Sequence, residues 1–314
     1  MKITIRQPLS FSEIGQKDNQ EDYVFPHPQK VSRDQCFFIL CDGMGGHEHG
    51  EVASSTVAEA LGRFLSKIKT GRIESADFSD ALDYAYQCLD EKDTEASLKK
   101  MGTTMTCVCF HEGGALVAHI GDSRIYHIRP NVAEEGNLGI LYQSSDHSLV
   151  NDLLKAGELT EEEVRSYPHK NIITRAIQPH QERHAKAEMF QLTDIKAGDY
   201  FFMCCDGVLE QLTNTRLCEI LSLPKLSDQD KLSLIKAECD GNTKDNYTCW
   251  LIPIDEAEED LQDNVAADIE YEVIRAEIEE EKKGLIQEDK NTLWGVMKSV
   301  GSKIFSIFHL RETM

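Results

Sequence analysis

Acidic side chains border apolar stretches at several points of this sequence. In two places an apolar run leads directly into Asp-Gly, in a third it leads into Gly-Asp, and twice acidic residues stand just before an apolar segment. The positions concerned are Glu21, Asp22, Asp42, Asp122, Asp206 and Asp245. A single Asp-Gly pair is typical of a turn, because both residues are favoured there. The repeated occurrence of acidic residues beside buried strands favours another role, since a buried carboxylate is costly unless it is paired or binds a cation.

The neighbouring residues favour a metal over ion pairing. Basic residues in these stretches are few, mainly Arg124 and Lys244. Carboxylates, a backbone carbonyl and water are hard oxygen ligands, which suit Mg²⁺ or Mn²⁺. The histidines do not follow a zinc spacing such as HExxH. Gly43, directly after Asp42, lets the backbone approach closely, so its carbonyl oxygen could also be a ligand.

Short strands and a few helices must position these carboxylates. Helical periodicity marks two segments, one from Val57 to Ile68 and the other from Phe78 to Leu89. A hairpin turn is expected at residues 112–116. Many non-local strands with few amphipathic helices predict packed sheets covered by helices. The strands expected from β-branched and apolar content span residues 37–41, 103–110, 115–120, 124–128, 200–205 and 246–252.

Composition limits the class of protein. The 314 residues suffice for one large domain or two modest ones, and 40% apolar with 28% charged residues is ordinary for a soluble protein. No apolar run is long enough to cross a bilayer, and the first residues do not resemble a signal peptide. The ten cysteines lie within apolar runs without a paired CxxC spacing, which predicts buried, reduced thiols. We therefore expect a cytoplasmic protein.

The net charge of −22 bears on which partners this protein can bind. Half of it comes from residues 255–290, which hold fifteen acidic and four basic side chains. A negative field repels nucleic acid, so a DNA- or RNA-binding function is disfavoured. The same field would repel a phosphate substrate unless bound cations reverse the sign locally.

Composition changes near residue 255, which predicts three segments. Residues 1–254 form the globular domain, residues 255–290 an acidic helical linker, and residues 291–314 an amphipathic C-terminal helix. The linker has a narrow apolar stripe, which could form a coiled coil or belong to a solvated helix. We expect the C-terminal helix to dock on its own globular domain or on a protein partner, and less on a membrane, because it has few basic residues.

Several stretches, read together, resemble the PPM family of protein phosphatases, the type 2C enzymes, in its bacterial form. They follow the family's order and cover nearly all of residues 10–254. The elements DGMGGH and GDSR are specific in combination. The matching stretches are KDNQEDYVF (17–25), LCDGMGGHEHGEVAS (40–54), MGTTMT (101–106), AHIGDSRIYHI (118–128), SSDHSLV (144–150), IITRAIQ (172–178), CCDGVLEQL (204–212) and DNYTCWLI (245–252).

The resemblance implies a fold, a reaction and partners. The fold is α+β, a four-layer α-β-β-α sandwich of two mostly antiparallel sheets flanked by helices, which residues 1–254 would form as the catalytic domain. The reaction is hydrolysis of phosphoserine and phosphothreonine by direct attack of a hydroxide that bridges two Mn²⁺ or Mg²⁺ ions, with no phosphoenzyme intermediate. Phosphorylated proteins would be the substrates, and a serine/threonine kinase the functional counterpart.

Metal ligands are implied residue by residue. Asp42 would bridge two cations, and Asp206 with Asp245 would complete the first site. Asp122 matches the position of a weaker third cation, shared with Asp206. The full implied set is Glu21, Asp22, Asp42, Gly43, Asp122, Asp206 and Asp245. The catalytic residues expected are Lys17, Asp22, Asp42, Asp206 and Asp245.

This sequence departs from the family pattern at two places. Lys17 stands where the family usually has an arginine that holds the substrate phosphate, and lysine keeps the charge but loses the bidentate fork. Met44 stands where many eukaryotic members have a histidine that is a candidate general acid, so the proton donor is unassigned. His47 and His49 lie nearby, but we expect structural or solvent-facing roles for both.

Two arginines and one variable segment belong to the remaining motifs. We expect Arg124 and Arg175 to form an internal ion pair or a cap. Residues 144–175 correspond to the variable region beside the family's active site, and their helical pattern could shape substrate choice.

Two alternatives stay open at this point. One is a catalytically weak binding module of the same fold that acts through its C-terminal tail. The other is a two-metal hydrolase that acts on a small phosphorylated molecule or on nucleic acid. The presence of every expected carboxylate favours an active phosphatase over the first, and the net charge disfavours nucleic acid for the second.

Overall fold

A computed structural model describes residues 2–44, 49–68, 73–93, 101–130, 138–160, 163, 167 and 172–258. Strand β12 (Tyr247–Glu258) runs past residue 254, the predicted end of the globular domain, because its last part pairs with β1 (Lys2–Ile5). The rest of the predicted linker and the predicted C-terminal helix lie outside the described residues.

Two six-stranded antiparallel sheets form the centre of the structure. In sheet I the order is β1, β12, β11 (Tyr200–Cys204), β8 (Arg124–Ile128) and β9 (Ile140–Gln143), and β2 (Leu9–Glu13) also pairs with β12. In sheet II the order is β10 (Glu188–Leu192), β7 (Gly114–Ile120), β6 (Met105–His111), β4 (Phe37–Met44) and β3 (Asp22–Phe25), with β5 (Gly102–Thr103) on β4.

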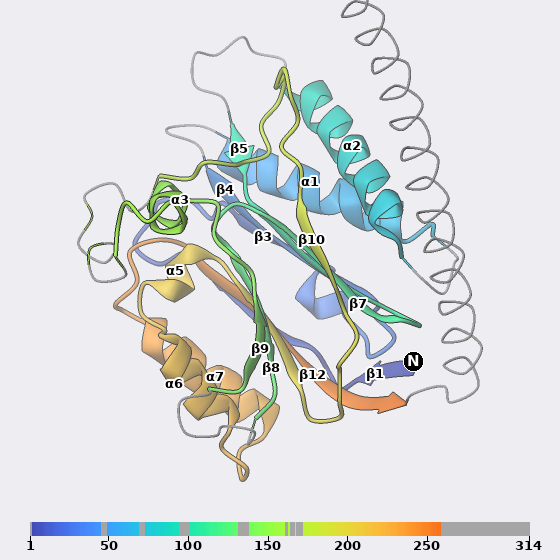
Figure 1. Ribbon diagram of the computed structural model, residues 1–314, viewed down its shortest axis with the longest axis vertical. Coiled ribbons are helices and arrows are strands. Elements are labelled where there is room, and N and C mark those ends of the chain that lie inside the picture. Colours follow the sequence, from blue (N-terminus) through green and yellow to red (C-terminus); the bar gives the residue numbers. More distant parts are fainter. Residues whose placement is uncertain are drawn as a thin grey trace, which may run out of the picture. The chain divides into compact units, whose positions relative to one another are not determined.

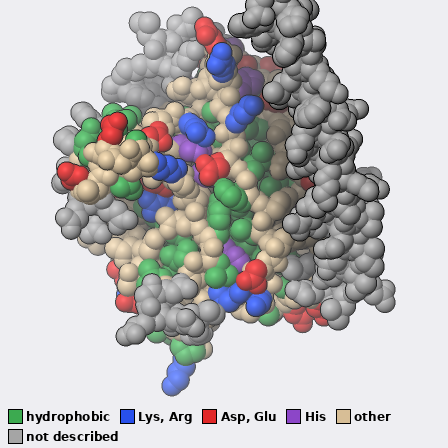
Figure 2. Space-filling model, in the orientation of Figure 1, with side chains coloured by type: hydrophobic (Ala, Val, Ile, Leu, Met, Phe, Trp, Pro, Cys, Tyr) green, Lys and Arg blue, Asp and Glu red, His purple; other side chains and the backbone are tan. Residues whose placement is uncertain are grey.

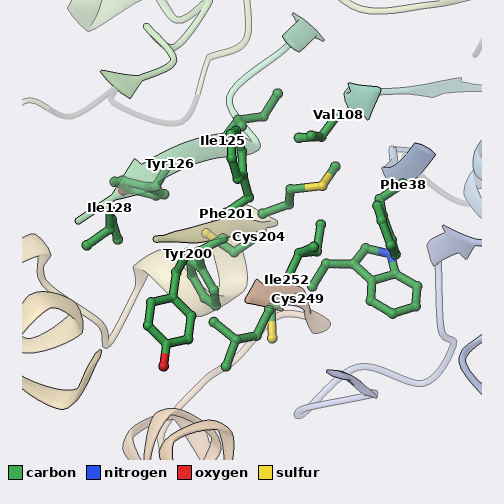
Figure 3. Close-up of a cluster of buried hydrophobic side chains, with 14 of the residues drawn as sticks. Phe38, Val108, Ile125, Tyr126, Ile128, Tyr200, Phe201, Cys204, Cys249 and Ile252 are labelled. Carbon is green, nitrogen blue, oxygen red and sulfur yellow. The ribbon is translucent and has the colours of Figure 1, made fainter. Parts of the chain in front are cut away.

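Alternation along β4 divides its side chains between two packing layers, as the period of a strand requires. Phe38 points toward sheet I, where its ring lies 5.3 Å from Trp250 of β12 in an edge-on arrangement. Phe110 of β6 meets Phe201 of β11 in the same way at 5.1 Å. Figure 3 shows this layer, with Phe38 facing the side chains of sheet I. The intervening Ile39 belongs instead to the cluster under the helices.

Helices cover the outer face of each sheet (Figure 1). Helices α1 (Gly50–Leu65) and α2 (Ser75–Lys92) pack on sheet II through residues such as Leu61 and Leu89. Helices α6 (Asn214–Leu221) and α7 (Asp228–Cys239) pack on sheet I through residues such as Leu217 and Ile235. The predicted four-layer sandwich is therefore confirmed.

Shorter elements complete the fold. A 3-10 turn, η1 (Pro28–Lys30), precedes β4, and α3 (Leu149–Lys155) and α5 (Asp206–Leu209) lie near one end of the sandwich (Figure 1). Among the described residues, no helix combines the length and the apolarity that a membrane span needs.

Strands β9 and β10 lie at the free edges of their sheets on the same side of the sandwich (Figure 1). Tyr142 of β9 and Phe190 of β10 bring their rings within 5.6 Å, so aromatic packing joins the two edges. Apolar side chains gather on this face in Figure 2. Only part of the helical pattern predicted between β9 and β10 is present, as α3, which begins after Ser148 because the Ser148 hydroxyl caps it. The helix ends at Lys155, and Gly157 beyond it has a positive φ of 75°.

Candidate metal centre and active site

The N-terminal end of β3 and the C-terminal end of β4 place two aspartates opposite each other. Asp22 and Asp42 are direct partners in the antiparallel register of these strands. The backbone of Asp42 is held on its other side, where its amide donates to Thr104 Oγ1 at 3.1 Å and its carbonyl accepts from the Thr103 hydroxyl at 2.9 Å. Opposed strand residues have their Cβ atoms about 4.5–5.5 Å apart, and carboxylate oxygens of Asp22 and Asp42 lie within 4.8 Å of each other.

A second pair of aspartates comes from sheet I. Asp206 follows β11 and begins α5, while Asp245 stands just before β12. Gly207 allows the two segments to touch, since a Cβ at this position would lie 1.9 Å from the carbonyl oxygen of Asn246. The requirement for glycine after Asp206 is therefore steric, and it brings Asp206 next to Asp245.

Burial and mutual repulsion disfavour the charged forms of these aspartates. Burial, and then the neighbouring Asp22 and Asp206, raise the pKa of Asp42 well above its usual value. Burial also raises the pKa of Asp22 to about 7, and burial with Asp245 raises that of Asp206 to about 6. Asp122 also contributes to the field at Asp42. The predicted carboxylates of both sheets thus come together at one place.

The arrangement fits divalent cations. Oδ1 of Asp22 and Oδ1 of Asp122 are buried, and neither has a hydrogen-bond donor among the described residues. Burial, followed by the field of Asp206, raises the pKa of Asp122 to about 7. Several buried carboxylates with unsatisfied oxygens are costly without a counter-charge, and hard cations take such oxygen ligands.

Glu21 and Gly43 lie at the edge of this cluster. The Gly43 amide donates to the Glu21 carbonyl oxygen at 3.1 Å, and a Cβ on Gly43 would lie 2.3 Å from the Gly50 carbonyl oxygen. The Glu21 side chain turns toward α1, where it accepts a hydrogen bond from the Gly50 backbone. Burial raises the pKa of Glu21.

Lys17, the predicted phosphate anchor, lies beside the cluster. Its Nζ is 2.9 Å from Asp245 Oδ1, and both side chains are partly exposed. Burial opposes the Lys17 charge, but the hydrogen bond with Asp245 and the negative charges of Asp245, Glu21 and Asp206 together outweigh it and raise the pKa of Lys17. A positive side chain thus stands at the open side of an otherwise negative site.

Asn246 is a residue that sequence reasoning missed. It is 4% exposed, and its Oδ1 accepts a hydrogen bond from the Glu21 amide at 2.8 Å. Its Nδ2 donates to the carbonyl oxygens of Ile14 and Asn19, both at 2.9 Å. One side chain therefore fixes the loop that carries Lys17 and Glu21. The signal available in the sequence was a polar asparagine that stands between Asp245 and an apolar strand.

Cys205 is a second missed residue. The sequence suggested only a small buried hydrophobe, yet its thiol donates to Asp22 Oδ2 at 3.2 Å. Its sulfur lies within 4.8 Å of carboxylate oxygens of Asp22 and Asp42. Burial, and then the neighbouring aspartates, raise the pKa of this thiol well above its usual value, so it stays protonated and serves as a donor.

A further group of titratable residues lies beside Asp122. Ligand atoms of His119, His147 and Glu188 lie within 4.8 Å of one another. The two histidines occur in stretches that carried the family resemblance, but their separation in sequence hid their contact.

The two arginines differ from each other. Arg124 forms a bidentate ion pair with Asp146, with both N···O distances 2.7 Å, as expected. Arg175 is exposed, and its Nη1 lies 3.4 Å from His147 Nε2. The predicted ion pair or cap for Arg175 is not found among the described residues, because β-bridge geometry around Ile173 directs this segment toward His147. His49 is half exposed before α1, and His47 lies outside the described residues.

Comparison with known proteins identifies the family. A family model described as protein phosphatase 2C matches residues 12–228. The chain belongs to this family. A putative protein phosphatase 2C-type of Streptococcus pyogenes is 33% identical over 257 residues, which are 80% of this chain and 97% of the relative. Protein phosphatase PhpP of Streptococcus pneumoniae is 32% identical over 250 residues, which are 78% of this chain and 96% of the relative.

Solved structures of family members have the same fold. The serine/threonine phosphatase PstP/Ppp of Mycobacterium tuberculosis has a TM-score of 0.67 at 28% identity, and the match covers 81% of this chain and 100% of that one. The catalytic domain of PstP in complex with two manganese ions has a TM-score of 0.65 at 27% identity, with 81% and 100% covered. The predictions of the family, the fold and a protein phosphatase of type 2C are confirmed, and the predicted Mn²⁺ or Mg²⁺ agrees with this relative's manganese pair.

Proposed function

We propose that this phosphatase 2C hydrolyses phosphoserine and phosphothreonine in proteins, using a hydroxide held between two Mn²⁺ or Mg²⁺ ions. The observation that carries the proposal is the partly buried carboxylate of Asp42, whose pKa is raised by the charges of Asp22, Asp206, Asp122 and Asp245. This cluster is unfavourable by itself and becomes favourable with bound cations. Relatives named serine/threonine phosphatases, one of them solved with manganese, support the same reaction.

The aspartates take distinct roles in this proposal. Asp42 would contribute a ligand to both cations, and Asp206 with Asp245 would complete the first site. The carbonyl of Gly43 would serve the second site, and Asp122 with Asp206 would hold a weaker third cation. A bound cation pair supplies a nucleophile at neutral pH and neutralises charge on the transferred phosphoryl group.

Residues around the second cation act partly through water. Asp22 lies opposite Asp42, its Oδ2 accepts from the Cys205 thiol, and its Oδ1 accepts no hydrogen bond from the described residues, so Oδ1 is available to a cation. Glu21 lies farther out, toward α1. We therefore propose a direct or near-direct role for Asp22 and a water-mediated role for Glu21.

Lys17 positions the substrate in this proposal. Its ammonium group is a compact charge at the exposed side of the cluster, where a phosphate oxygen of the substrate can replace Asp245 as its partner. An in-line displacement then needs only a phosphoryl group that is held in one orientation.

The proposed reaction implies a class of substrate and an opposing enzyme, and the cysteines bear on the cellular compartment. Phosphorylated proteins are the substrates, and a serine/threonine kinase is the opposing enzyme. All ten cysteines are free in the structure, which fits a reducing compartment such as the cytoplasm.

We also propose that residues 291–314 dock on the catalytic domain or on a protein partner. Their apolar residues recur at helical spacing, which favours a buried face over an exposed one. Truncation should follow Glu258, because β12 needs its last residues to pair with β1. Unchanged activity, oligomeric state and partner binding after this truncation would refute a regulatory role.

The catalytic proposal is tested by phosphate release from a phosphothreonine peptide and from p-nitrophenyl phosphate, with Mn²⁺, with Mg²⁺ and with EDTA. Turnover that requires the metal and is lost in Asp206→Asn supports the proposal. Folded protein without turnover under any metal would instead favour the binding-module alternative.

A further inference from the structure

His147 holds the backbone next to Asp122 from two sides. The His147 amide donates to the Gly121 carbonyl oxygen at 2.9 Å, and the Gly121 amide donates to His147 Nδ1 at 3.1 Å. Gly121 has a φ of +105°, and a Cβ there would lie 2.6 Å from Thr104 Cγ2. Because glycine is required here and is intrinsically flexible, the position of Asp122 depends on bonds from outside its own loop.

The imidazole of His147 is fixed in one tautomer. Since Nδ1 accepts a hydrogen bond, the ring proton of the neutral form is on Nε2. Nε2 lies 3.4 Å from Glu188 Oε2, which can accept that proton's hydrogen bond, and 3.4 Å from Arg175 Nη1. The shorter bond from the Gly121 amide, which can only donate, decides between the two tautomers, so Nε2 does not accept from Arg175. The residue is 3% exposed, and burial, followed by His119 and Arg175, lowers its pKa to about 4. The Nδ1 acceptor is therefore available at neutral pH.

Packing holds the ring in place. His147 stacks on His119 with ring centroids 4.6 Å apart and an angle of 10° between the planes. His119 is fully buried and its Nε2 donates to the Ser145 carbonyl oxygen at 2.9 Å. The His119 ring therefore cannot turn without losing its hydrogen bond to Ser145.

A metal ion between His119, His147 and Glu188 fits the geometry less well than a hydrogen-bond relay. A cation in the plane of one ring would lie out of the plane of the other, because the rings are nearly parallel. His147 Nε2 would also have to lose its proton while Nδ1 keeps its bond to Gly121. His119, His147 and Glu188 instead contact one another, and His147 bonds the loop that carries Asp122.

The same residue anchors the variable segment 144–175. The His147 carbonyl oxygen accepts from the Thr174 amide at 2.8 Å, and the Leu149 amide donates to the Ile172 carbonyl oxygen at 2.9 Å. Both ends of the segment that contains α3 are therefore joined at residues 147–149. A shift of residues 147–149 or 172–174 would therefore reach Gly121 through the bonds of His147.

We propose that His147 is a positioning residue that fixes Asp122 through Gly121 and thereby couples the segment 144–175 to cation binding at Asp122. The inference rests on the proposed function, because it needs Asp122 to be a cation ligand. Removal of a hydrogen-bond partner behind a metal ligand costs about 10- to 100-fold in metal affinity. A substrate that shifts the segment would, by the same contacts, change the affinity for this cation.

The test compares two variants of His147 with a control variant of Glu188, which lies at the other ring nitrogen. His147→Asn places Oδ1 where Nδ1 stands, His147→Leu removes the acceptor, and Glu188→Gln keeps an acceptor for Nε2. Bound Mn²⁺ is counted by electron paramagnetic resonance titration, and exchange of the Gly121 amide is followed by NMR. We expect His147→Leu to weaken the weakest Mn²⁺ site at least about tenfold and to accelerate Gly121 exchange, whereas His147→Asn stays close to the wild type.

Asp122→Asn is the reference variant that separates the role of Asp122 as a cation ligand from the positioning role of His147. If it leaves every Mn²⁺ site intact, the assignment of Asp122 as a ligand fails. If it removes the weakest site while His147→Leu changes neither that site nor Gly121 exchange, only the positioning role is overturned. Should His147→Leu not fold, His147→Gln replaces it, because its amide cannot reach the Nδ1 position. Equal weakening by Asn and Gln would overturn the acceptor role.

Discussion

Replacing Asp22 by asparagine should stabilise the metal-free protein at neutral pH. The Asp22 side chain is buried, with the residue 6% exposed, and it faces Asp42 in the strand register. Burial raises its pKa from 3.8 to about 7. In the folded state the group then keeps its proton between these two values, while in the unfolded state it ionises near pH 4.

The sign of the pH dependence follows from these proton numbers. Because the folded protein binds more protons, its stability falls as the pH rises from about 4 to about 7. The cost is about 1.4 kcal/mol per pH unit midway between the two pKa values and declines near pH 7, so the interval from pH 5 to pH 7 costs about 2 kcal/mol for Asp22. Asp22→Asn removes this loss, because the amide has nearly the same shape and does not ionise.

The measurement is urea unfolding at pH 5 and pH 7.5 in EDTA, for the wild type and Asp22→Asn. We expect the free energy of unfolding of the variant to gain about 2.5 kcal/mol relative to the wild type between the two pH values. With saturating Mn²⁺ the order should reverse, because the cation binds the ionised carboxylate. A variant that is less stable than the wild type at pH 7.5 in EDTA would refute the electrostatic account of the cluster.

Three further perturbations address the surroundings of the cluster. Lys17→Ala should raise the Michaelis constant for a phosphothreonine peptide and Lys17→Arg should lower it, because the fork of arginine binds phosphate at two points; an unchanged constant in steady-state kinetics would contradict a phosphate-binding role. Asn246→Ala loses three hydrogen bonds and should reduce the free energy of unfolding in EDTA by about 3 kcal/mol, whereas a loss below about 1 kcal/mol would speak against its hold on the Lys17 loop. Gly207→Ala places a Cβ 1.9 Å from the Asn246 carbonyl oxygen and should lower the melting temperature more than Gly198→Ala, which meets no atom within 4 Å and bears only the backbone strain of a φ of +88°. Equal shifts in thermal unfolding would refute the steric argument.

The sequence allowed the residues of the cluster to be predicted because they stand at the ends of strongly apolar strands. The strand expected at residues 124–128 is β8 with the same limits, and the aspartates after residues 41 and 205 mark where β4 and β11 approach their ends. These signals are local, since apolar content and turn residues both act over a few positions.

Elements with weak local patterns were missed. Helix α7 buries Lys231 with Leu232 and Ile235, so its sequence lacks a continuous apolar stripe. Edge strands β9 and β10 are only partly buried and therefore carry mixed side chains. The resemblance to the family supplied the helical layer over sheet I that periodicity did not.

Contacts between distant residues could not be read from the sequence. The hydrogen bond of Asn246 with Glu21 joins residues that are 225 positions apart, and that of Cys205 with Asp22 joins residues 183 positions apart. The stack of His119 on His147 likewise exists only because two loops meet. Such partners depend on tertiary packing, which leaves no periodic pattern in the sequence.

The most direct test of the account is phosphate release from a phosphothreonine peptide by the full chain, titrated with Mn²⁺ from an EDTA-treated preparation. Asp206→Asn serves as the matched variant, and circular dichroism verifies that it is folded. The account predicts no release in EDTA, turnover that rises with Mn²⁺ in the wild type, and a loss of that turnover in the variant. Equal release by the variant, or release that persists in EDTA, would contradict catalysis by cations at this aspartate cluster.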